Sequence, residues 1–447
     1  PRVFTAPTVT PLTATQPNLP QAINFSPVTP QIASPEAPFI PTISADAPGT
    51  ANGDAQWVDQ TKSVAPIAQQ NITGGTINVV ADGASFSLTT SGTVMEGVTG
   101  NNVKTSNGTK NENWTGMGLA KGQYAVMKNV GGQTLNINNV TINFSGEGDY
   151  AFSGTRRTNR WLFHTDGHND NGSSTWILGN GTKINLTGNS LMMYTSQYHG
   201  YSSDHSTIGF VNDGATITST GNNNKIWMGL KEDAYNDSRF MYFHNKSGDI
   251  KLQGAQNIFS YIDIPLVGYS NTAQQGFTIQ NDANIELNGN KNFGIIVANG
   301  RAYNNAEIVL NKPITIKGSE SVGILFNGSW AKLNGGTNRT KSSAANEVTD
   351  FYTAAAGGAT VQSRSSVIKL DMAGNKNTGM YFNYTGTDSF DINDYEITST
   401  DGTGNTGFFI QDGTVKLGSS GAKHEITMTG GNGNTGIYTA SADPLTT

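Results

Sequence analysis

The chain has 447 residues, including 54 Gly, 15 Pro and no Cys, with 13% charged residues and a net charge of −6. Glycine and asparagine, both poor helix formers, together make up close to a quarter of it, which excludes a compact helical protein. The lack of Cys excludes disulfides, thiol catalysis and Cys-ligated metals. Only 27 residues are Lys or Arg and they form no basic stripe, so nucleic acid is excluded as a partner. No apolar run approaches the length of a membrane-spanning helix.

Residues 1–48 form a proline-rich segment that contains eleven of the 15 prolines and no glycine. Proline fixes φ and biases the preceding residue towards extended backbone, so we predict an extended, polyproline-II-like chain. Two interpretations stay open for it. The segment is either a spacer stalk, or a strap that lies along the next domain. The apolar residues available to anchor such a strap are Val3, Phe4, Phe25, Phe39 and Ile40.

A repeat begins near Ile72, in which an isoleucine precedes a glycine by four to six residues. From Ile184 onward the isoleucines are spaced by 33, 33, 35, 29, 54, 29 and 29 residues. The copies begin at Ile184, Ile217, Ile250, Ile285, Ile314, Ile368, Ile397 and Ile426. Each copy continues through Asn and Gly into a second apolar run, and the last three copies share Asn-Thr-Gly, as in Asn405-Thr406-Gly407.

Each copy is typical of a short strand, a Gly/Asn turn, a second short strand and a looser return. Alternation such as Ile250-Lys251-Leu252 points one side chain inward and the next outward. A unit of this size cannot bury its own apolar face, so the units must stack. We therefore predict an all-β protein, a right-handed parallel β-helix with about 28–35 residues per coil and roughly 12–13 coils.

This pattern predicts four regions. The proline-rich segment 1–48 is followed by capping and irregular coils over residues 49–149, since the first coil of a solenoid needs a covered edge. Residues 150–245 form coils with long loops, and residues 246–447 form regular coils. The interval of 54 residues is either two units or one unit with an insertion near residues 341–360.

Residues 150–245 are the candidate binding region, because they contain five of the six His and a concentration of Trp, Arg and Tyr. Loops that lengthen on one side of a solenoid commonly form its binding surface, and aromatic and Arg side chains dominate such surfaces. The alternative is that the aromatics fill wider coils and the histidines are solvated. The predicted ligand-binding residues are Arg156, Arg157, Arg160, Trp161, His164, Asp166, His168, Tyr198, His199, Tyr201 and Trp227.

The same region offers weak signals for metal binding and catalysis. His164, Asp166, His168 and Asp170 lie within seven residues, but the spacing matches no metalloprotease helix. The carboxylates available to a β-helical polysaccharide lyase or hydrolase, together with an arginine, are Asp166, Asp170, Glu232, Asp233, Asp237 and Arg239. No G-x-S-x-G motif occurs. We predict no catalytic residues, no metal, no cofactor and no enzyme activity.

The Asn-x-Gly coil signature, the lack of Cys and the proline-rich leader resemble the passenger domains of type V (monomeric) autotransporter adhesins. The similarity is greatest to the large fusobacterial RadD-like outer-membrane adhesins, and it covers the repeats from about Gly188 to Tyr438. The resemblance implies a signal peptide and a C-terminal membrane-anchoring β-barrel, which we expect outside this sequence. It also implies a location at the bacterial cell surface.

The resemblance further implies adhesion to glycans or proteins on host cells or other bacteria. We therefore expect a cell-surface adhesin fragment that mediates cell–cell adhesion. The alternatives are a β-helical polysaccharide-degrading enzyme, or the structural stalk of a larger surface protein. An enzyme would need two carboxylates within about 10 Å in a groove.

Overall fold

A computed structural model gives the fold of the chain. The residues it describes are 34–40, 69–82, 85–91, 94–96, 125–130, 134–146, 161–166, 174–188, 190–197, 207–231, 240–264, 276–300, 305–329, 339–340, 353–354, 367–385, 389–392, 394–418 and 423–440. The chain divides into two compact units, Pro1–Ser34 and Pro35–Thr447. All described residues except Ser34 belong to the second unit.

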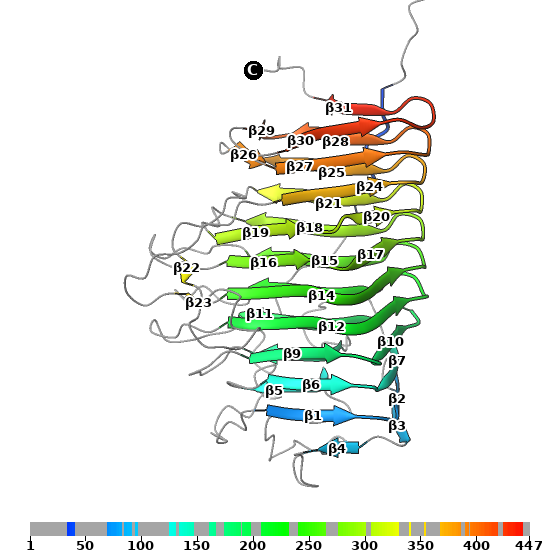
Figure 1. Ribbon diagram of the computed structural model, residues 1–447, viewed down its shortest axis with the longest axis vertical. Coiled ribbons are helices and arrows are strands. Elements are labelled where there is room, and N and C mark those ends of the chain that lie inside the picture. The colour runs from blue at the N-terminus through cyan, green and yellow to red at the C-terminus, as the bar shows by residue number, and fades with distance from the viewer. Residues whose placement is uncertain are drawn as a thin grey trace, which may run out of the picture. The chain divides into compact units, whose positions relative to one another are not determined.

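The described part of this unit is all-β and contains no helix. Its strands stack in parallel register from coil to coil, as Figure 1 shows. The fold is a parallel β-helix, as predicted from the repeat. A complete coil has three strands, one on each of three faces. We call these faces A, B and C, in the order in which the chain passes through them. Faces A and B belong to the 17-stranded sheet, and face C is the 10-stranded sheet.

Face A contains β1 (Gln69–Thr73), β6 (Thr134–Asn138), β9 (Ser174–Gly179), the first parts of β12 (Thr207–Ser219) and β14 (Phe240–Leu252), β16 (Gly276–Asn281) and β19 (Asn305–Leu310). In the last coils its place in the chain is taken by the separate pair β26 (Ser389–Ile392) and β29 (Thr414–Leu417). Face B contains β2 (Thr76–Asp82), β7 (Thr141–Gly146), β10 (Lys183–Leu186), the second parts of β12 and β14, β17 (Asn284–Leu287), β20 (Ile314–Ile316), β24 (Val367–Met372), β27 (Asp394–Ser399) and β30 (His424–Met428).

Face C contains β5 (Ala125–Val130), β8 (Trp161–Asp166), β11 (Leu191–Gln197), β13 (Lys225–Lys231), β15 (Ile258–Ile264), β18 (Phe293–Gly300), β21 (Val322–Ser329), β25 (Thr378–Thr385), β28 (Thr406–Asp412) and β31 (Thr435–Thr439). At the other end of the stack, β3 (Ser85–Ser91) and β4 (Val94–Glu96) pair antiparallel with β2 and β1. These two strands cover an edge that the first coil would otherwise leave unpaired.

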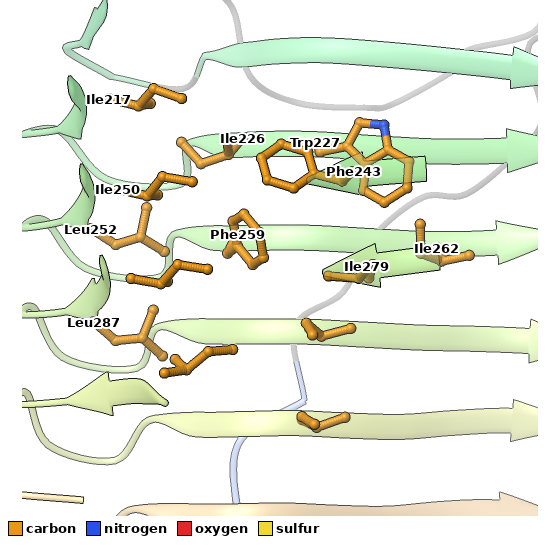
Figure 2. Close-up of a cluster of buried hydrophobic side chains, with 14 of the residues drawn as sticks. Ile217, Ile226, Trp227, Phe243, Ile250, Leu252, Phe259, Ile262, Ile279 and Leu287 are labelled. Carbon is orange, nitrogen blue, oxygen red and sulfur yellow. The ribbon is translucent and has the colours of Figure 1, made fainter. Parts of the chain in front are cut away.

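The hydrophobic core runs through the inside of the stack and is rich in aromatic side chains. Phe210 stacks on Phe243 with ring centroids 5.1 Å apart, and Phe243 meets Phe259 edge-on at 4.9 Å. Trp227 lies 5.6 Å from Phe243, and both side chains are fully buried. Figure 2 shows the rings of Trp227, Phe243 and Phe259 among the isoleucines and leucines of faces A, B and C. Inward side chains of successive coils thus form one continuous core.

The turn from face B to face C is held by a ladder of stacked polar side chains. The backbone N–H of Asn377 donates to Asn405 Oδ1 at 2.8 Å, and the N–H of Asn405 donates to Asn434 Oδ1 at the same distance. The same arrangement joins each turn to the next from the first coil of the ladder to the last. Its members in order are Ser190, Asn224, Asn257, Asn292, Ser321, Asn377, Asn405 and Asn434. We call this set the turn ladder.

A second asparagine ladder holds the corner between faces A and B. Asn212 Nδ2 donates to Asn245 Oδ1 at 2.9 Å, and Asn245 Nδ2 donates to Asn281 Oδ1 at 2.8 Å. Asn212 Oδ1 also accepts the N–H of Ala215 across the bend, where Gly214 has a φ of 107°. All three asparagines are fully buried, so the ladder satisfies polar groups that the corner removes from water.

The glycine of the Asn-x-Gly signature is explained by close contact between coils. A Cβ on Gly294 would lie 2.3 Å from the carbonyl oxygen of Gly323, and one on Gly379 would lie 2.7 Å from that of Gly407. Contacts this short do not occur for real Cβ atoms. The signature therefore combines an asparagine for the turn ladder with a glycine that lets the next coil approach.

The register corrects one detail of the predicted repeat and decides between the two alternatives for another. Ile184, Ile217, Ile250, Ile285 and Ile314 pair in sequence as expected. Ile314, however, pairs with Leu370 rather than Ile368, and Leu370 then pairs with Ile397. In addition, β21 pairs directly with β25, so the long interval is one coil with an insertion, in which β22 (Arg339–Thr340) and β23 (Thr353–Ala354) form a small antiparallel pair.

The predicted 12–13 coils are too many for the described part of the chain, where face C has ten strands. The insertion and the long connections use chain without adding a rung to the stack. Stacking these strands at about 4.8 Å gives face C a length of roughly 43 Å between its first and last strands.

Candidate functional site

The connections from face C to face A differ from those at the other two corners. From β10 onward each turn between faces B and C belongs to the turn ladder. The connections that leave face C instead range from the single residue Gly413, before β29, to residues 330–366, which lead to β24 on face B. Those of intermediate length are 167–173, 198–206, 232–239 and 265–275. We call the set of strand ends from which they leave the variable edge.

The variable edge brings two groups of predicted binding residues to adjacent coils. His164 and Asp166 lie on β8, and His168 follows that strand after Gly167. Tyr198, His199 and Tyr201 follow β11. Strands β8 and β11 are parallel neighbours, with Asp166 paired to Ser196. Both connections therefore leave the same edge, about 4.8 Å apart at their bases. His168, Tyr198, His199 and Tyr201 lie outside the described residues.

The arginines of the predicted site enter at a different place. Arg156, Arg157 and Arg160 lie outside the described residues, in the connection 147–160 that leads from face B into the first residue of β8. Trp161 is that first residue, and Asp166 is the last. A strand of this length spans roughly 17 Å. The fold thus attaches the arginine group and the His168 group to opposite ends of one strand.

Trp227 was predicted to bind a ligand, and the structure shows that this prediction is wrong. Its side chain is fully buried in the core against Phe243, and Trp176 of the same region is also fully buried. A ligand at the surface cannot reach these rings. Part of the aromatic concentration in residues 150–245 therefore comes from filling the interior of the coils. Sequence alone could not separate the two uses, since a tryptophan suits a core and a binding surface equally well.

A polar cluster on the outer side of face A was missed from the sequence. It consists of Asp213, His244, Lys246 and Asp282. His244 Nε2 lies 2.7 Å from Asp282 Oδ2, and Lys246 Nζ donates to Asp213 Oδ2 at 3.1 Å. A signal for it exists, because Asp213, Lys246 and Asp282 each follow an asparagine of the A–B corner ladder. An alignment of the repeats on those asparagines would have placed Asp213, Lys246 and Asp282 at the same position of successive coils.

Burial decides the protonation of this cluster. Burial lowers the pKa of His244 below 6.5, and the positive charge of Lys246 lowers it further. The hydrogen bond to Asp282 and the negative charge of Asp282 raise this pKa, but by less than burial lowers it. Burial alone would raise the pKa of Asp282, but hydrogen bonds from Asn311, His244 and Gln280 lower it overall. Near neutral pH, therefore, a neutral imidazole is hydrogen-bonded to a carboxylate.

The lowered pKa of His244 predicts loss of stability on mild acidification. Its folded pKa lies below its unfolded value, so the unfolded chain takes up a proton first as the pH falls through 6.5. The contribution of neutral His244 to the free energy of unfolding is therefore fully present above pH 6.5. It is lost as the pH falls towards the lower pKa of His244 in the folded protein. We expect His244→Gln to reduce the fall in the denaturation midpoint between about pH 7.5 and pH 5.5. An equal fall in both proteins would contradict this assignment.

The described residues provide no further support for catalysis or metal binding. They contain no group of three or more His, Asp or Glu that could hold a metal ion. Asp170, Glu232, Asp233, Asp237 and Arg239, the carboxylates and the arginine considered for a polysaccharide-cleaving site, lie outside the described residues. Among the described residues, no helix is long and apolar enough to cross a membrane.

Comparisons of the chain with protein-family models, with curated proteins and with solved structures found no match. The assignment of function therefore depends on the geometry described above and on the resemblance noted from the sequence.

Proposed function

We propose that this chain is the passenger fragment of a bacterial cell-surface adhesin, which binds glycans or proteins on other bacteria or on host cells. The carrying observation is the contrast between the corners of the coil. Asparagine ladders hold the A–B and B–C corners over successive coils, whereas the variable edge accepts connections of very different length. A rigid stack with one variable edge can change its loops without changing its fold.

The position of the predicted binding residues supports the same proposal. His168 and the group Tyr198, His199 and Tyr201 follow neighbouring strands at the variable edge. Tyrosine and histidine supply large amphipathic contact area with few side-chain torsions, which suits recognition of sugars or protein surfaces. We propose that a single ligand that spans two coils contacts both groups.

The proposal is tested with a variant that removes this group and a matched control. The test variant is H168A/H199A/Y201A. The control variant is K251A/K317A, which removes two lysines on face B, away from the variable edge. These lysines form the ion pairs Lys251–Asp249 and Lys317–Glu286. Beads coated with each purified protein are scored for attachment to bacterial and host cells. We expect attachment by the test variant to fall about tenfold or more and that by the control to stay near wild type.

A structural stalk and a binding site at the other end of β8 predict different results in the same assay. If the chain is only a structural stalk, the test variant attaches as well as wild type while its circular dichroism spectrum stays that of a β protein. A separate variant, R156A/R157A/R160A, measures the group at the other end of β8. Loss of attachment in that variant alone would move the binding site from the variable edge to the entrance of β8.

A further inference from the structure

The outer surface of face C is apolar, unlike that of face B. A column of outward side chains crosses the coils in direct register, from Met228 on β13 to Tyr438 on β31. Its members are Met228, Tyr261, Ile296, Leu325, Tyr381, Phe409 and Tyr438. Together with Leu191, Ile258, Phe293, Ala298 and Val322, they form a hydrophobic cluster separate from the interior core. We call this cluster the outer ladder.

The outer ladder is buried although it faces away from the core. Met228, Phe293, Val322 and Leu325 have no exposed surface, and Phe409 is 2% exposed. A β-helix normally turns polar side chains outward, as face B does with Lys251 and Glu286, and a bare apolar column would be an aggregation hazard. Some part of the chain must therefore cover it.

Among the described residues, the proline-rich segment supplies cover. The ring of Phe39 lies 6.3 Å from the ring of Phe293, and Ile40 packs against the outer ladder. In Figure 1 this segment, in dark blue, runs along the direction in which the coils stack and so crosses the strands. This is the strap interpretation for Pro35–Ile40. Val3, Phe4 and Phe25 lie outside the described residues.

The prolines of the segment are spaced by three residues. Pro35, Pro38 and Ile40 are half-buried, whereas Glu36, Ala37 and Phe39 are exposed, Phe39 by 43%. A polyproline-II helix has three residues per turn and rises about 9.3 Å in one turn. Two coils of the stack rise about 9.6 Å. One face of a polyproline-II chain that crosses the strands therefore meets an equivalent position on every second coil.

We propose that the outer ladder is a docking site for a polyproline-II chain, and that Pro35–Ile40 of the same chain is its occupant. The chemistry matches other sites for proline-rich chains, in which aromatic and aliphatic side chains receive prolines from a preformed extended helix. Here Phe293, Tyr381 and Phe409 supply the aromatic surface. The backbone of the ligand needs no partner in the sheet, because all strands of face C are already paired with each other. This inference is independent of the proposed adhesin function.

The proposal predicts that the site binds the same sequence added as a separate peptide once the strap is weakened. The strap variant is F39S/I40S, which removes the two side chains in contact with the outer ladder. The matched control is E36S/A37S, which changes the two exposed residues beside them. The probe is a fluorescein-labelled synthetic peptide with the sequence of residues 34–41, and its binding is followed by fluorescence anisotropy.

We expect the strap variant to bind the peptide at least about tenfold more tightly than wild type and the control, in which Pro35–Ile40 fills the site. Adding L325D to the strap variant should abolish that binding. Equal binding to all proteins, or no binding to a strap variant that retains its circular dichroism spectrum, would overturn the proposal. If F39S/I40S fails to fold, I40A is measured instead. The affinity of I40A for the peptide should lie between that of wild type and that expected for F39S/I40S. Exchange of the segment between two copies, seen as a wild-type dimer by light scattering and lost in F39S/I40S, would also overturn the assignment to the same chain.

Discussion

Replacing Trp227 with alanine is expected to lower the free energy of unfolding by about 3–5 kcal/mol. The indole is fully buried and packs on Phe243, which itself contacts Phe210 and Phe259. Removing it leaves a cavity that the coils above and below cannot fill, because each is held in place by its own turns. Chemical denaturation followed by circular dichroism measures the loss.

The same variant separates a core role from a binding role for Trp227. Trp227→Phe retains an aromatic ring in the core and should lose markedly less stability than Trp227→Ala. Cell attachment by either variant should fall only in proportion to the unfolded fraction. A folded Trp227→Ala protein of wild-type stability that no longer attaches would restore the original prediction that this residue contacts a ligand.

Replacing Asn377 with alanine is expected to break the turn ladder at its centre. Its Oδ1 accepts the N–H of Ser321 at 2.9 Å, and its Nδ2 donates to the carbonyl oxygen of Gly318 at 2.8 Å. Both bonds are buried, and a buried backbone group without a partner costs about 1–3 kcal/mol. Losing the two together therefore makes this one of the largest effects available from a single polar residue.

Asn375→Ala is the matched control for this prediction. Asn375 Oδ1 also accepts a backbone N–H from the next coil, that of Thr403, but this bond is exposed, so water can replace it. We expect the control to cost less than about 1 kcal/mol. Hydrogen exchange should show faster exchange at Ser321 in Asn377→Ala only. Similar losses for the two variants would mean that burial of the ladder contributes little.

The alternation of apolar and polar residues predicted the fold well but its register less well. Ile184 to Ile314 pair as the repeat indicated, because each is followed by a Gly at nearly constant distance. In β24 the residues Ile368, Leu370 and Met372 all point inward, so the pattern fits two registers equally. The turn decides between them, since Gly374 and Asn377 stack on Gly318 and Ser321.

The candidate site could be predicted from the sequence only as a set of connections. His168 and Tyr198 lie outside the described residues, after the neighbouring strands β8 and β11. The repeat indicated only which segments are connections. It could not show that Trp227 points inward, since Ile226, Trp227 and Met228 are all apolar. Nor could it place His244 beside Asp282 without the alignment of the corner asparagines.

The sequence by itself determined the stacked parallel coils, because period, turn residues and inward side chains are all local properties that each unit repeats. Only the tertiary structure decided which surface Phe39 and Ile40 contact. Phe39 and Phe293 are far apart in the chain, and their contact leaves no local trace in either segment. An outward apolar residue on face C looks the same in the sequence as an inward one, and only the structure shows which of them belong to the outer ladder, beside Phe39 and Ile40.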